Sequence, residues 1–516
     1  MKKSMIKQYK KQGGKFGSKF PNYLLVAVPR ARLAVCKGYK FGSKLPNSLS
    51  VAVSQAQLAI CGGIRMKSVA FHNLGCKVNG YEMDYMQQIL QEKGYRIVSF
   101  DEKADIYIIN TCTVTNIADR KSRQMLHRAK KMNPESVVVA VGCYVQAGGE
   151  ETLKDKSIDL AIGNNKKKDL LPILEEFLAK KEREGAKEDK TLQGRTMIDI
   201  GHTDEYESMD LYHTAEHTRA FIKVQDGCNQ FCSYCIIPYV RGRIRSREPK
   251  DILDEVRRLS TNGYKEVVLT GIHLSSYGMT QGKDFSMSRL LWLIEKLQQE
   301  TGIERIRLGS LEPRIITEEF VKGLFGCTKL CPHFHLSLQS GCDKVLERMN
   351  RKYSTKEYYD KVCILRKYFD EPAITTDVIV GFPGETREDF EKTKEFLQMI
   401  GFYEMHIFKY SKRKGTPAAV MDGQVSEEEK ARRSNALLEM EREMSKEYRK
   451  SYLHKQTEVL FEEEKTIGGR NYQIGHTKEY IRAACETKDD LSGQIQKGTL
   501  TGFLMSDILL FQPQIH

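Results

Sequence analysis

The pattern of apolar and polar positions changes along the chain and divides it into regions. Between residues 67 and 165, short apolar runs alternate with amphipathic stretches of helical period. Continuous apolar runs that alternate with helices are typical of a parallel sheet covered on both faces. This region therefore predicts strands at 69–71, 106–109 and 137–141 and helices at 79–93 and 117–132.

The region from 216 to 450 repeats an alternation of strand and helix. Apolar runs that end in polar or glycine-rich positions predict strands at 220–225, 266–270, 305–310, 333–339, 373–380 and 403–410. Successive strand–helix units of this kind predict an incomplete (β/α)6 barrel, with its chemistry at the carboxyl ends of the strands. Ser426, followed by three glutamates, opens a long charged helix that closes this region.

After residue 450 the pattern becomes β-rich. Stretches at 457–461, 480–484, 498–504 and 509–512 predict a small β-barrel. The predicted fold class is α/β, with an amino-terminal parallel α/β domain at 66–168, the (β/α)6 barrel at 216–450 and the β-barrel at 451–516. Residues 169–215 combine a short amphipathic helix near 170–178 with a charged stretch poor in apolar residues, which predicts a linker.

The first 65 residues have a character of their own. The sequence KFGSKFPN at 15–22 recurs as KFGSKLPN at 40–47, so this segment contains a duplication. Two copies are too few for a stable solenoid. We expect a disordered, non-native extension, with Met66 as the biological start. A secretory signal is the alternative, but the apolar run at 24–28 is short and the cysteines that follow need to stay reduced.

The net charge of +14 on 516 residues is misleading about binding partners. Residues 1–66 contain thirteen Lys and Arg and no Asp or Glu, so the remainder carries 69 basic against 68 acidic side chains. Any contact with RNA must therefore come from local patches rather than from the charge of the whole chain. No apolar run approaches the roughly 20 residues that a membrane-spanning helix requires.

The strongest chemical signal lies just after the first predicted strand of the (β/α)6 barrel. Cys228, Cys232 and Cys235 have the spacing C-x3-C-x2-C. Three thiolates at this spacing can hold a [4Fe–4S] cluster whose fourth iron has no protein ligand and stays open to a substrate or cofactor. A zinc knuckle is the alternative, but it needs a second pair of Cys or His close by, and no such pair precedes Cys327.

Three further cysteines stand just past the ends of predicted strands in the amino-terminal domain. They are Cys76, Cys112 and Cys143. In a parallel sheet the carboxyl ends of the strands share one edge, where ligands bind, so we expect these thiols to converge. Buried structural cysteines are the alternative. Three cysteines at equivalent positions favour a second iron–sulfur cluster.

These motifs carry a family resemblance. The C-x3-C-x2-C motif, with Tyr234 before its third cysteine, resembles that of the radical S-adenosylmethionine (SAM) enzymes. The sequence RGRIRSR at 241–247, together with GCKVN at 75–79, NTC at 110–112 and GC at 142–143, narrows the resemblance to the methylthiotransferases. A solvated charged loop is the alternative for the arginine run, and the nearby cluster motif favours a functional role.

The resemblance implies two [4Fe–4S] clusters and SAM as cofactors. Cys228, Cys232 and Cys235 would be the catalytic residues, holding the cluster that cleaves SAM to a 5′-deoxyadenosyl radical. Cys76, Cys112 and Cys143 would hold the cluster that delivers sulfur, and a second SAM would methylate that sulfur. The strand-end positions expected to bind SAM are Tyr234, Thr270, Gly271, Ser337, Gln339 and Gly381.

Within this family, the GCKVN motif and the compact tail resemble the branch that methylthiolates C2 of N6-threonylcarbamoyladenosine beside the anticodon of tRNA. The C–H bond at C2 has no acidity for a general base to use, which explains the need for a carbon radical. Three alternatives stay open. They are the same chemistry on isopentenyladenosine, methylthiolation of an aspartate in a ribosomal protein, and, in a different class, a non-catalytic iron–sulfur protein that binds RNA or transfers electrons.

The resemblance also implies the partners. We expect the tRNA anticodon stem-loop, an electron donor such as flavodoxin or ferredoxin, and a sulfur donor, and we expect a cytoplasmic monomer without a membrane. The carboxy-terminal domain resembles a TRAM-type RNA-binding barrel. From Lys455 onward it has seven basic against nine acidic residues, so its RNA-binding role is implied by domain order and not by charge.

Overall fold

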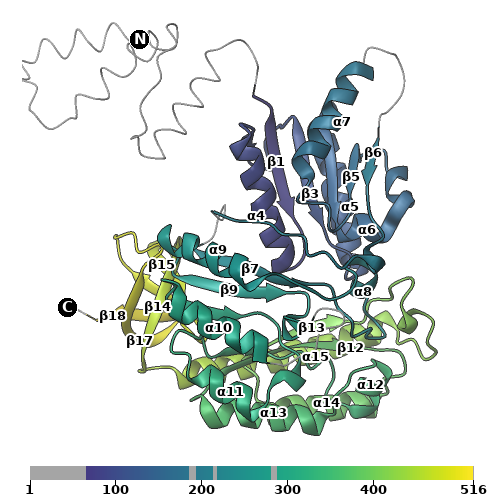
Figure 1. Ribbon diagram of the computed structural model, residues 1–516. Coiled ribbons are helices and arrows are strands. Elements are labelled where there is room, and N and C mark those ends of the chain that lie inside the picture. Colours follow the sequence, from purple (N-terminus) through teal and green to yellow (C-terminus); the bar gives the residue numbers. More distant parts are fainter. Residues whose placement is uncertain (1–65, 185–192, 213–217, 280–287, 515–516) are drawn as a thin grey trace, which may run out of the picture. The chain divides into compact units, whose positions relative to one another are not determined.

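The computed structural model describes residues 66–184, 193–212, 218–279 and 288–514. The chain divides at Met66 into two units, and the description that follows concerns Lys67–His516 (Figure 1). The duplicated extension at 1–65, and with it the expectation that Met66 is the biological start, lies outside the described residues.

The amino-terminal domain is built on a parallel sheet of strand order β2-β1-β3-β4-β5-β6. Its strands are β1 (Ser68–Asn73), β2 (Arg96–Val98), β3 (Ile106–Thr111), β4 (Val137–Gly142), β5 (Leu160–Ile162) and β6 (Gly194–Thr196). Its α-helices are α4 (Lys77–Glu92), α5 (Asn116–Met132), α6 (Cys143–Gly148) and α7 (Leu170–Glu184). The predicted strands correspond to β1, β3 and β4, and the predicted helices to α4 and α5.

Side chains from β4 show why this sheet is covered on both faces. Val137, Val139 and Val141 pack into one apolar cluster with residues of α4 and α7, whereas Val138 and Ala140 pack into another with residues of α5. A strand with both faces buried reads as a continuous apolar run, as the sequence does here. The stretch 169–215, expected as a linker, contains α7 and β6, and β6 pairs in parallel with β5.

The central domain is the predicted (β/α)6 barrel. Its parallel strands are β7 (Arg219–Asp226), β9 (Glu266–Gly271), β10 (Arg305–Leu308), β11 (His333–His335), β12 (Ala373–Val380) and β13 (Glu404–Lys409). They form two sheets, β10-β9-β7-β8 and β11-β12-β13, linked by a parallel bridge between Leu311 and Leu336. The short β8 (Arg245–Ser246) runs antiparallel to β7.

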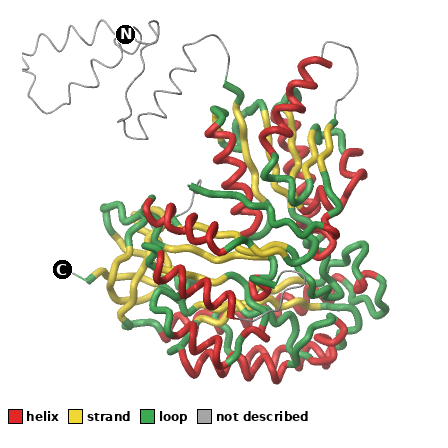
Figure 2. Tube along the Cα trace, viewed as in Figure 1, coloured by secondary structure: helices red, strands yellow, loops and turns green. Residues whose placement is uncertain are grey.

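Helices cover the outside of this barrel (Figure 2). They are α9 (Pro249–Thr261), α10 (Ser288–Glu300), α11 (Glu318–Phe325), α12 (Asp343–Arg348), α13 (Thr355–Tyr368), α14 (Arg387–Ile400) and α15 (Glu427–Ser451). The short α8 (Ile237–Val240) packs instead against Cys143 at the start of α6. Apolar side chains from the strands and from α9, α10, α11, α13 and α14 form one large core. Ser426 accepts a hydrogen bond from the Glu429 N–H and starts α15, as the sequence predicts.

The carboxy-terminal domain is a closed barrel of strand order β14-β15-β16-β18-β17. Its strands are β14 (Gln456–Ile467), β15 (Arg470–His476), β16 (Arg482–Glu486), β17 (Ile495–Met505) and β18 (Ile508–Pro513). Tyr480, just before β16, joins this domain to the central barrel. The guanidinium carbons of Arg219 and Arg307 lie 4.9 and 4.8 Å from the centre of its ring, which fits cation–π contacts.

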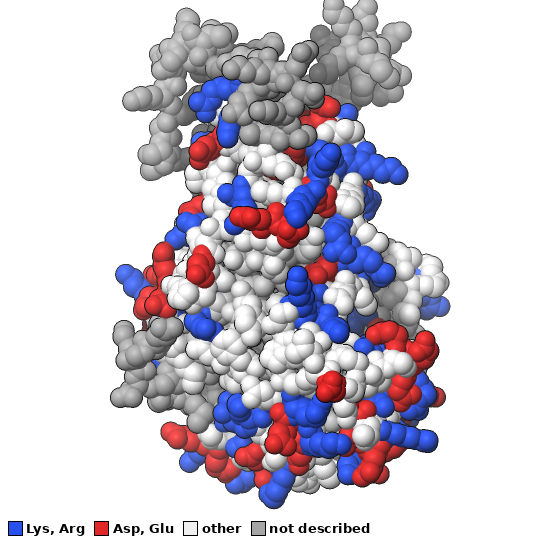
Figure 3. All heavy atoms as spheres, turned by 90° about the vertical axis from the view of Figure 1, so that its right-hand side faces the viewer, with Lys and Arg blue, Asp and Glu red and all other residues white. Residues whose placement is uncertain are grey.

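Charge is mixed on the face of the molecule shown in Figure 3. Lys and Arg side chains are interspersed with Asp and Glu, and the middle of this face is mostly uncharged. This arrangement agrees with the nearly balanced charge of residues 67–516. In the described part of the chain, no helix is both long and apolar enough to cross a membrane.

Candidate active site

The structure brings the first cysteine triad to one edge of the amino-terminal sheet. Cys76 follows β1, Cys112 follows β3 directly, and Cys143 follows β4 directly. These strands are neighbours in the sheet, so their carboxyl ends lie side by side. The Leu74 N–H donates to the carbonyl of Asn110 at 2.9 Å and holds the loop of Cys76 against the end of β3. The expected convergence therefore follows from the topology of the sheet.

Two glycines allow this close approach. Gly75 and Gly142 have φ of +110° and +97°, a conformation that L side chains rarely adopt. A Cβ on Gly75 would lie 3.1 Å from the Cβ of Cys112 and 3.3 Å from its Sγ, and a Cβ on Gly142 would lie 2.6 Å from Oδ1 of Asn110. Each glycine directly precedes a cysteine of the triad. The glycine allows the backbone conformation and the close packing, and the cysteine supplies the thiol.

The second triad lies in the loop that follows β7. The Cys228 N–H donates to the carbonyl of Gly242 at 3.0 Å, and the Cys235 N–H donates to the carbonyl of Cys232 at 2.9 Å. A Cβ on Gly227 would lie 1.8 Å from the carbonyl oxygen of Arg243. The loop that carries these cysteines is therefore pressed against the arginine-rich stretch that comes after it.

Each triad receives a hydrogen bond from an arginine, which is buried in the case of Arg241 and half-buried in the case of Arg351. Nε of Arg241 lies 3.4 Å from Sγ of Cys143, and Nη1 of Arg351 lies 3.2 Å from Sγ of Cys232. Nδ2 of Asn164 also lies 3.5 Å from Sγ of Cys143. Hydrogen bonds and positive charge beside sulfur ligands stabilise thiolates, so both environments suit anionic cluster ligands.

Arg241 belongs to the central barrel, but its guanidinium contacts residues of the amino-terminal domain. Its guanidinium donates to both carboxylate oxygens of Glu82, at 2.5 and 3.0 Å, and to Oδ1 of Asn79 at 2.5 Å. It also lies 3.3 Å from the carboxylate of Asp226. Asn79 and Glu82 are on α4, in the first and second helical turns after Cys76, so this arginine ties the first cysteine loop to the second.

Two lysines complete this buried charge network. Lys167 and Lys223 both pair with Glu82, and Lys223 also lies 2.8 Å from Asp226. Burial alone would raise the pKa of Glu82, but Arg241, Lys167 and Lys223 together hold it well below its usual range. Of these cations, Arg241 lies beside Cys143. Its charge suits an anionic cluster with thiolate ligands.

Most of the arginine-rich stretch is buried, which excludes the solvated loop that was its alternative. Arg241, Arg245 and Arg247 are almost fully buried. Arg245 donates to the carbonyl of Arg241 at 2.8 Å, and Arg247 pairs with Glu255 at 2.6 Å. Arg247 also donates to the hydroxyl of Tyr81 on α4 at 3.1 Å, so this stretch, together with Arg241, contributes to the contact between the two domains.

Burial keeps several thiols of the two triads protonated. Burial raises the pKa of Cys112 and of Cys235 to about 12, and that of Cys228 to about 11. Without a metal these side chains are neutral at pH 7, so cluster binding must displace their protons. Within the described ranges, no three Cys, His, Asp or Glu side chains gather tightly enough to share a single ion. A cubane spreads its ligands over separate irons and does not require that convergence.

The expected SAM-binding residues lie at the carboxyl ends of the barrel strands, on the side of the second triad. Thr270 and Gly271 end β9, and Gly381 follows β12 with φ of +71°. Gln339 has φ of +75° and forms a parallel bridge with Val378. The remaining two positions are Ser337, whose carbonyl accepts from Arg351, and Tyr234, whose ring packs edge-on against Phe382.

Near the second triad, Arg351 was not expected from the sequence, and the sequence did not decide whether His273 belongs to the core or to the SAM side. Arg351 contacts Cys232 from 119 positions away, and its guanidinium lies over the ring of Tyr353. His273 is half-buried, and burial together with Arg351 and Arg314 lowers its pKa to about 4. Its Nε2 has no hydrogen-bond partner among the described residues. Arg351 lies in the loop between α12 and α13, and nothing in the sequence around it indicates that it contacts Cys232.

The amino-terminal domain and the central barrel each match a known protein family. Residues 222–397 match the model of the radical SAM superfamily, and residues 68–163 match the uncharacterized protein family UPF0004. Among solved structures, a radical SAM methyltransferase, TsrM from Kitasatospora setae, has a TM-score of 0.49 at 15% identity, covering 69% of this chain and 77% of that one.

Curated relatives extend over most of the chain. The threonylcarbamoyladenosine tRNA methylthiotransferase MtaB of Bacillus subtilis is 39% identical over 433 residues, covering 84% of this chain and 93% of the relative. The MtaB of Aquifex aeolicus is 41% identical, covering 78% and 95%. The tRNA-2-methylthio-N(6)-dimethylallyladenosine synthase of Clostridium botulinum (strain Okra / Type B1) is 36% identical, covering 75% and 84%. With both cysteine triads in place, the chain belongs to the radical SAM methylthiotransferase family.

Proposed function

We propose that this enzyme methylthiolates C2 of N6-threonylcarbamoyladenosine in tRNA. The observation that carries this proposal is the 36–41% identity to relatives named for that reaction, over at least three quarters of the chain. The two cysteine triads, each with its own arginine donor, are the equipment that the reaction needs. The cofactors of the enzyme are SAM and [4Fe–4S] clusters.

We assign one cluster to each triad. Cys228, Cys232 and Cys235 would hold the cluster that binds and cleaves SAM, and Cys76, Cys112 and Cys143 would hold the second cluster. When bound, these groups supply a carbon radical for hydrogen abstraction, sulfur for insertion and a methyl group for transfer. The described donor set fits because each triad leaves one iron of a cubane without a protein ligand.

The protein's own contribution is positioning and electrostatics. Arg241 and Arg351 donate N–H groups toward Cys143 and Cys232 and offset the negative charge that builds up on the sulfur atoms. Arg241 also fixes α4 against the loop of the second triad through Glu82 and Asn79. Two clusters that act on one adenine must keep a constant separation, and this buried network holds both loops in place.

Methylthiolation of dimethylallyladenosine is the second candidate, because relatives at 35–37% identity carry the name of that synthase. The two substrates differ at N6 of the adenosine and share the reacting C2. Mass spectrometry of tRNA nucleosides from cells with and without the gene separates them. Loss of the methylthio group from threonylcarbamoyladenosine supports the proposal, and loss only from the dimethylallyl nucleoside contradicts it.

We also propose the supporting partners that this chemistry needs. SAM cleavage consumes one electron, so a low-potential donor such as flavodoxin or ferredoxin would act with the enzyme, and the inserted sulfur must come from a sulfur donor. We propose that the enzyme works as a cytoplasmic monomer and that its carboxy-terminal barrel, which resembles a TRAM domain, contacts the anticodon stem-loop.

A further inference from the structure

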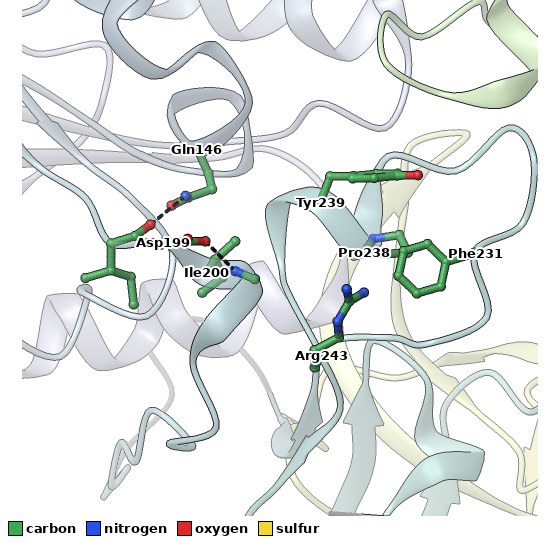
Figure 4. Close-up of a pocket in the computed structure, with 9 residues that line it drawn as sticks. Gln146, Asp199, Ile200, Phe231, Pro238, Tyr239 and Arg243 are labelled. Atoms are coloured by element: carbon green, nitrogen blue, oxygen red, sulfur yellow. Dashed lines mark hydrogen bonds between the residues drawn. The ribbon is translucent and has the colours of Figure 1, made fainter. Parts of the chain in front are cut away.

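A cavity of about 280 Å³ lies next to α8, which supplies Pro238 and Tyr239 to its lining (Figure 4). One wall comes from the second triad's loop and the residues after it, and the other from residues 198–201 and α6. Its lining residues are Gln146, Ile198, Asp199, Ile200, Gly201, Phe231, Pro238, Tyr239 and Arg243. Phe231 stands between Cys228 and Cys232 in the chain, and Gln146 follows Cys143 by less than one helical turn. A ligand in this cavity would therefore contact segments of the chain that carry cysteines of both triads.

One wall is a platform of rings and a guanidinium. The guanidinium carbon of Arg243 lies 4.6 Å from the centre of the Phe231 ring. The ring of Tyr239 meets Phe231 edge-on, with centroids 5.9 Å apart, and Tyr239 is 48% exposed. Exposed aromatic faces beside an arginine are how proteins bind unstacked bases without reading a long sequence.

The backbone holds this platform in place. Phe231 has φ of +48°, a strained conformation for a bulky residue that persists only where the surroundings enforce it. Its carbonyl accepts from Nδ2 of Asn350 at 3.0 Å. A Cβ on Gly242 would lie 2.1 Å from the carbonyl oxygen of Ile200, so the opposite wall is in direct contact with the stretch that carries Arg243. The cavity is preorganised, which reduces the entropy lost on binding.

The guanidinium of Arg243 has no carboxylate partner in the part of the chain that the structure describes. Across the described ranges, no Asp or Glu forms an ion pair with its guanidinium. The nearby carboxylate of Asp199 is engaged by His202 at 2.7 Å and by the Gly201 N–H at 3.0 Å. A half-buried guanidinium without an anionic partner is a suitable contact for a phosphate, to which it can donate two hydrogen bonds.

We propose that this cavity binds an unpaired nucleotide of the anticodon loop that neighbours the modified adenosine, with its base on Tyr239 and its phosphate at Arg243. The inference rests on the proposed function, since it takes tRNA as the substrate. It adds a site that positions the loop so that the adjacent adenosine reaches the space between the two triads.

The test measures binding of an anticodon stem-loop RNA to the reconstituted enzyme by fluorescence anisotropy. Tyr239→Ala is expected to weaken binding roughly tenfold, because stacking of one base is lost, whereas Tyr239→Phe retains the ring and the affinity. The logarithm of the association constant falls with the logarithm of the salt concentration, with a slope that reports the number of phosphate contacts. Arg243→Gln should reduce that slope by the amount expected for about one phosphate contact. Thermal unfolding and iron content of each variant should match those of the parent enzyme.

Tyr212 provides a matched control. It is also exposed, at 42%, and also lies beneath an arginine, with the guanidinium carbon of Arg258 at 5.0 Å. Tyr212→Ala should leave RNA binding unchanged. A stem-loop that lacks the base beside the target adenosine should bind the parent enzyme as weakly as the complete RNA binds Tyr239→Ala, and the two changes together should not add.

The outcomes separate this proposal from the proposed function. If the parent enzyme binds the stem-loop and Tyr239→Ala binds it equally well, the cavity does not hold a nucleotide and the inference is wrong. If Tyr239→Ala instead weakens binding of SAM with RNA affinity unchanged, the cavity belongs to the SAM site and the inference is equally wrong. If the parent enzyme does not bind the stem-loop at all, the proposed function itself fails.

Discussion

At the scale of single residues, the cysteines of the two triads divide the chemistry between them. Cys112→Ala should remove one ligand of the amino-terminal cluster and leave the other triad intact. With no fourth thiolate in reserve, that cluster should be lost and the iron content should fall by about half. The variant should still form 5′-deoxyadenosine in the presence of a strong reductant, without modifying tRNA.

The matched variant is Cys232→Ala, which should abolish formation of 5′-deoxyadenosine and keep the amino-terminal cluster. Iron analysis and chromatography of the SAM products distinguish the two variants. Parent rates of tRNA methylthiolation by Cys112→Ala would show that the amino-terminal triad is structural.

Arg241 connects the loop of the second triad to α4 and to Cys143 of the first triad. Arg241→Gln would leave Glu82 and Asp226 buried with fewer cations and would remove a hydrogen bond to Cys143. Breaking a buried ion-pair network of this kind lowers the free energy of unfolding by about 3 kcal/mol. The reduction potential of the amino-terminal cluster, measured by electron paramagnetic resonance, should also fall because an N–H···S bond is lost.

Arg257→Gln is the control for this prediction, because Arg257 is exposed and pairs with Asp254 and Glu300 at the surface. It should change the free energy of unfolding by less than about 1 kcal/mol and leave the potential unchanged. Equal effects of the two substitutions would contradict the role assigned to Arg241.

At the scale of elements, the stretch from the end of β7 to β8 does most of the positioning, and it depends on Gly227 and Gly242. Gly242→Ala would place a methyl group 2.1 Å from the carbonyl oxygen of Ile200 and would strain a residue with φ of +71°. We expect this variant to lose most of the second cluster and more than about 2 kcal/mol of stability.

Gly263→Ala isolates the contribution of the clash, because Gly263 has φ of +94° and nothing within 4 Å of its added Cβ. It should lose only the conformational part, about 1 kcal/mol, and keep both clusters. Chemical denaturation and iron analysis of both variants test the difference. If Gly242→Ala behaves like Gly263→Ala, the contact with Ile200 does not shape the loop.

Elements also show how far sequence reasoning reaches. The strands with long β-branched runs, such as β4 and β12, were predicted because their pattern is local. The short strands β2, β5 and β6 have too few residues to show a period, and β15 is polar along much of its length. The cysteine motifs were found because their spacing is local, or because the topology of a parallel sheet brings strand ends together.

The partners of those cysteines have no such signal. Arg351 and Cys232 are 119 residues apart, and Lys223 and Glu82 are 141 apart. The residues of each pair come together only because the strands and helices between them in the sequence fold into a fixed arrangement. The arginine run after the second triad suggested a functional role, but its buried part points into the contact with α4, which spacing alone does not reveal.

At the scale of the whole molecule, both cysteine triads lie in the described unit. The duplicated segment before Met66 shares no pattern with this unit, and its structure lies outside the described residues. A chain that begins at Met66 is therefore expected to keep full iron content and full tRNA methylthiolation. A large loss of activity in that shorter chain, with both clusters intact, would show that the extension has a role.

The central claim is that one enzyme with two three-cysteine clusters methylthiolates threonylcarbamoyladenosine. The most direct test incubates the reconstituted enzyme with SAM, a strong reductant and a sulfur source, using tRNA that carries either threonylcarbamoyladenosine or dimethylallyladenosine. The nucleosides are then measured by mass spectrometry. The account predicts that a methylthio group replaces hydrogen on the threonylcarbamoyl nucleoside in preference to the other. Formation of 5′-deoxyadenosine with threonylcarbamoyladenosine unchanged, or modification of the dimethylallyl nucleoside alone, would contradict it.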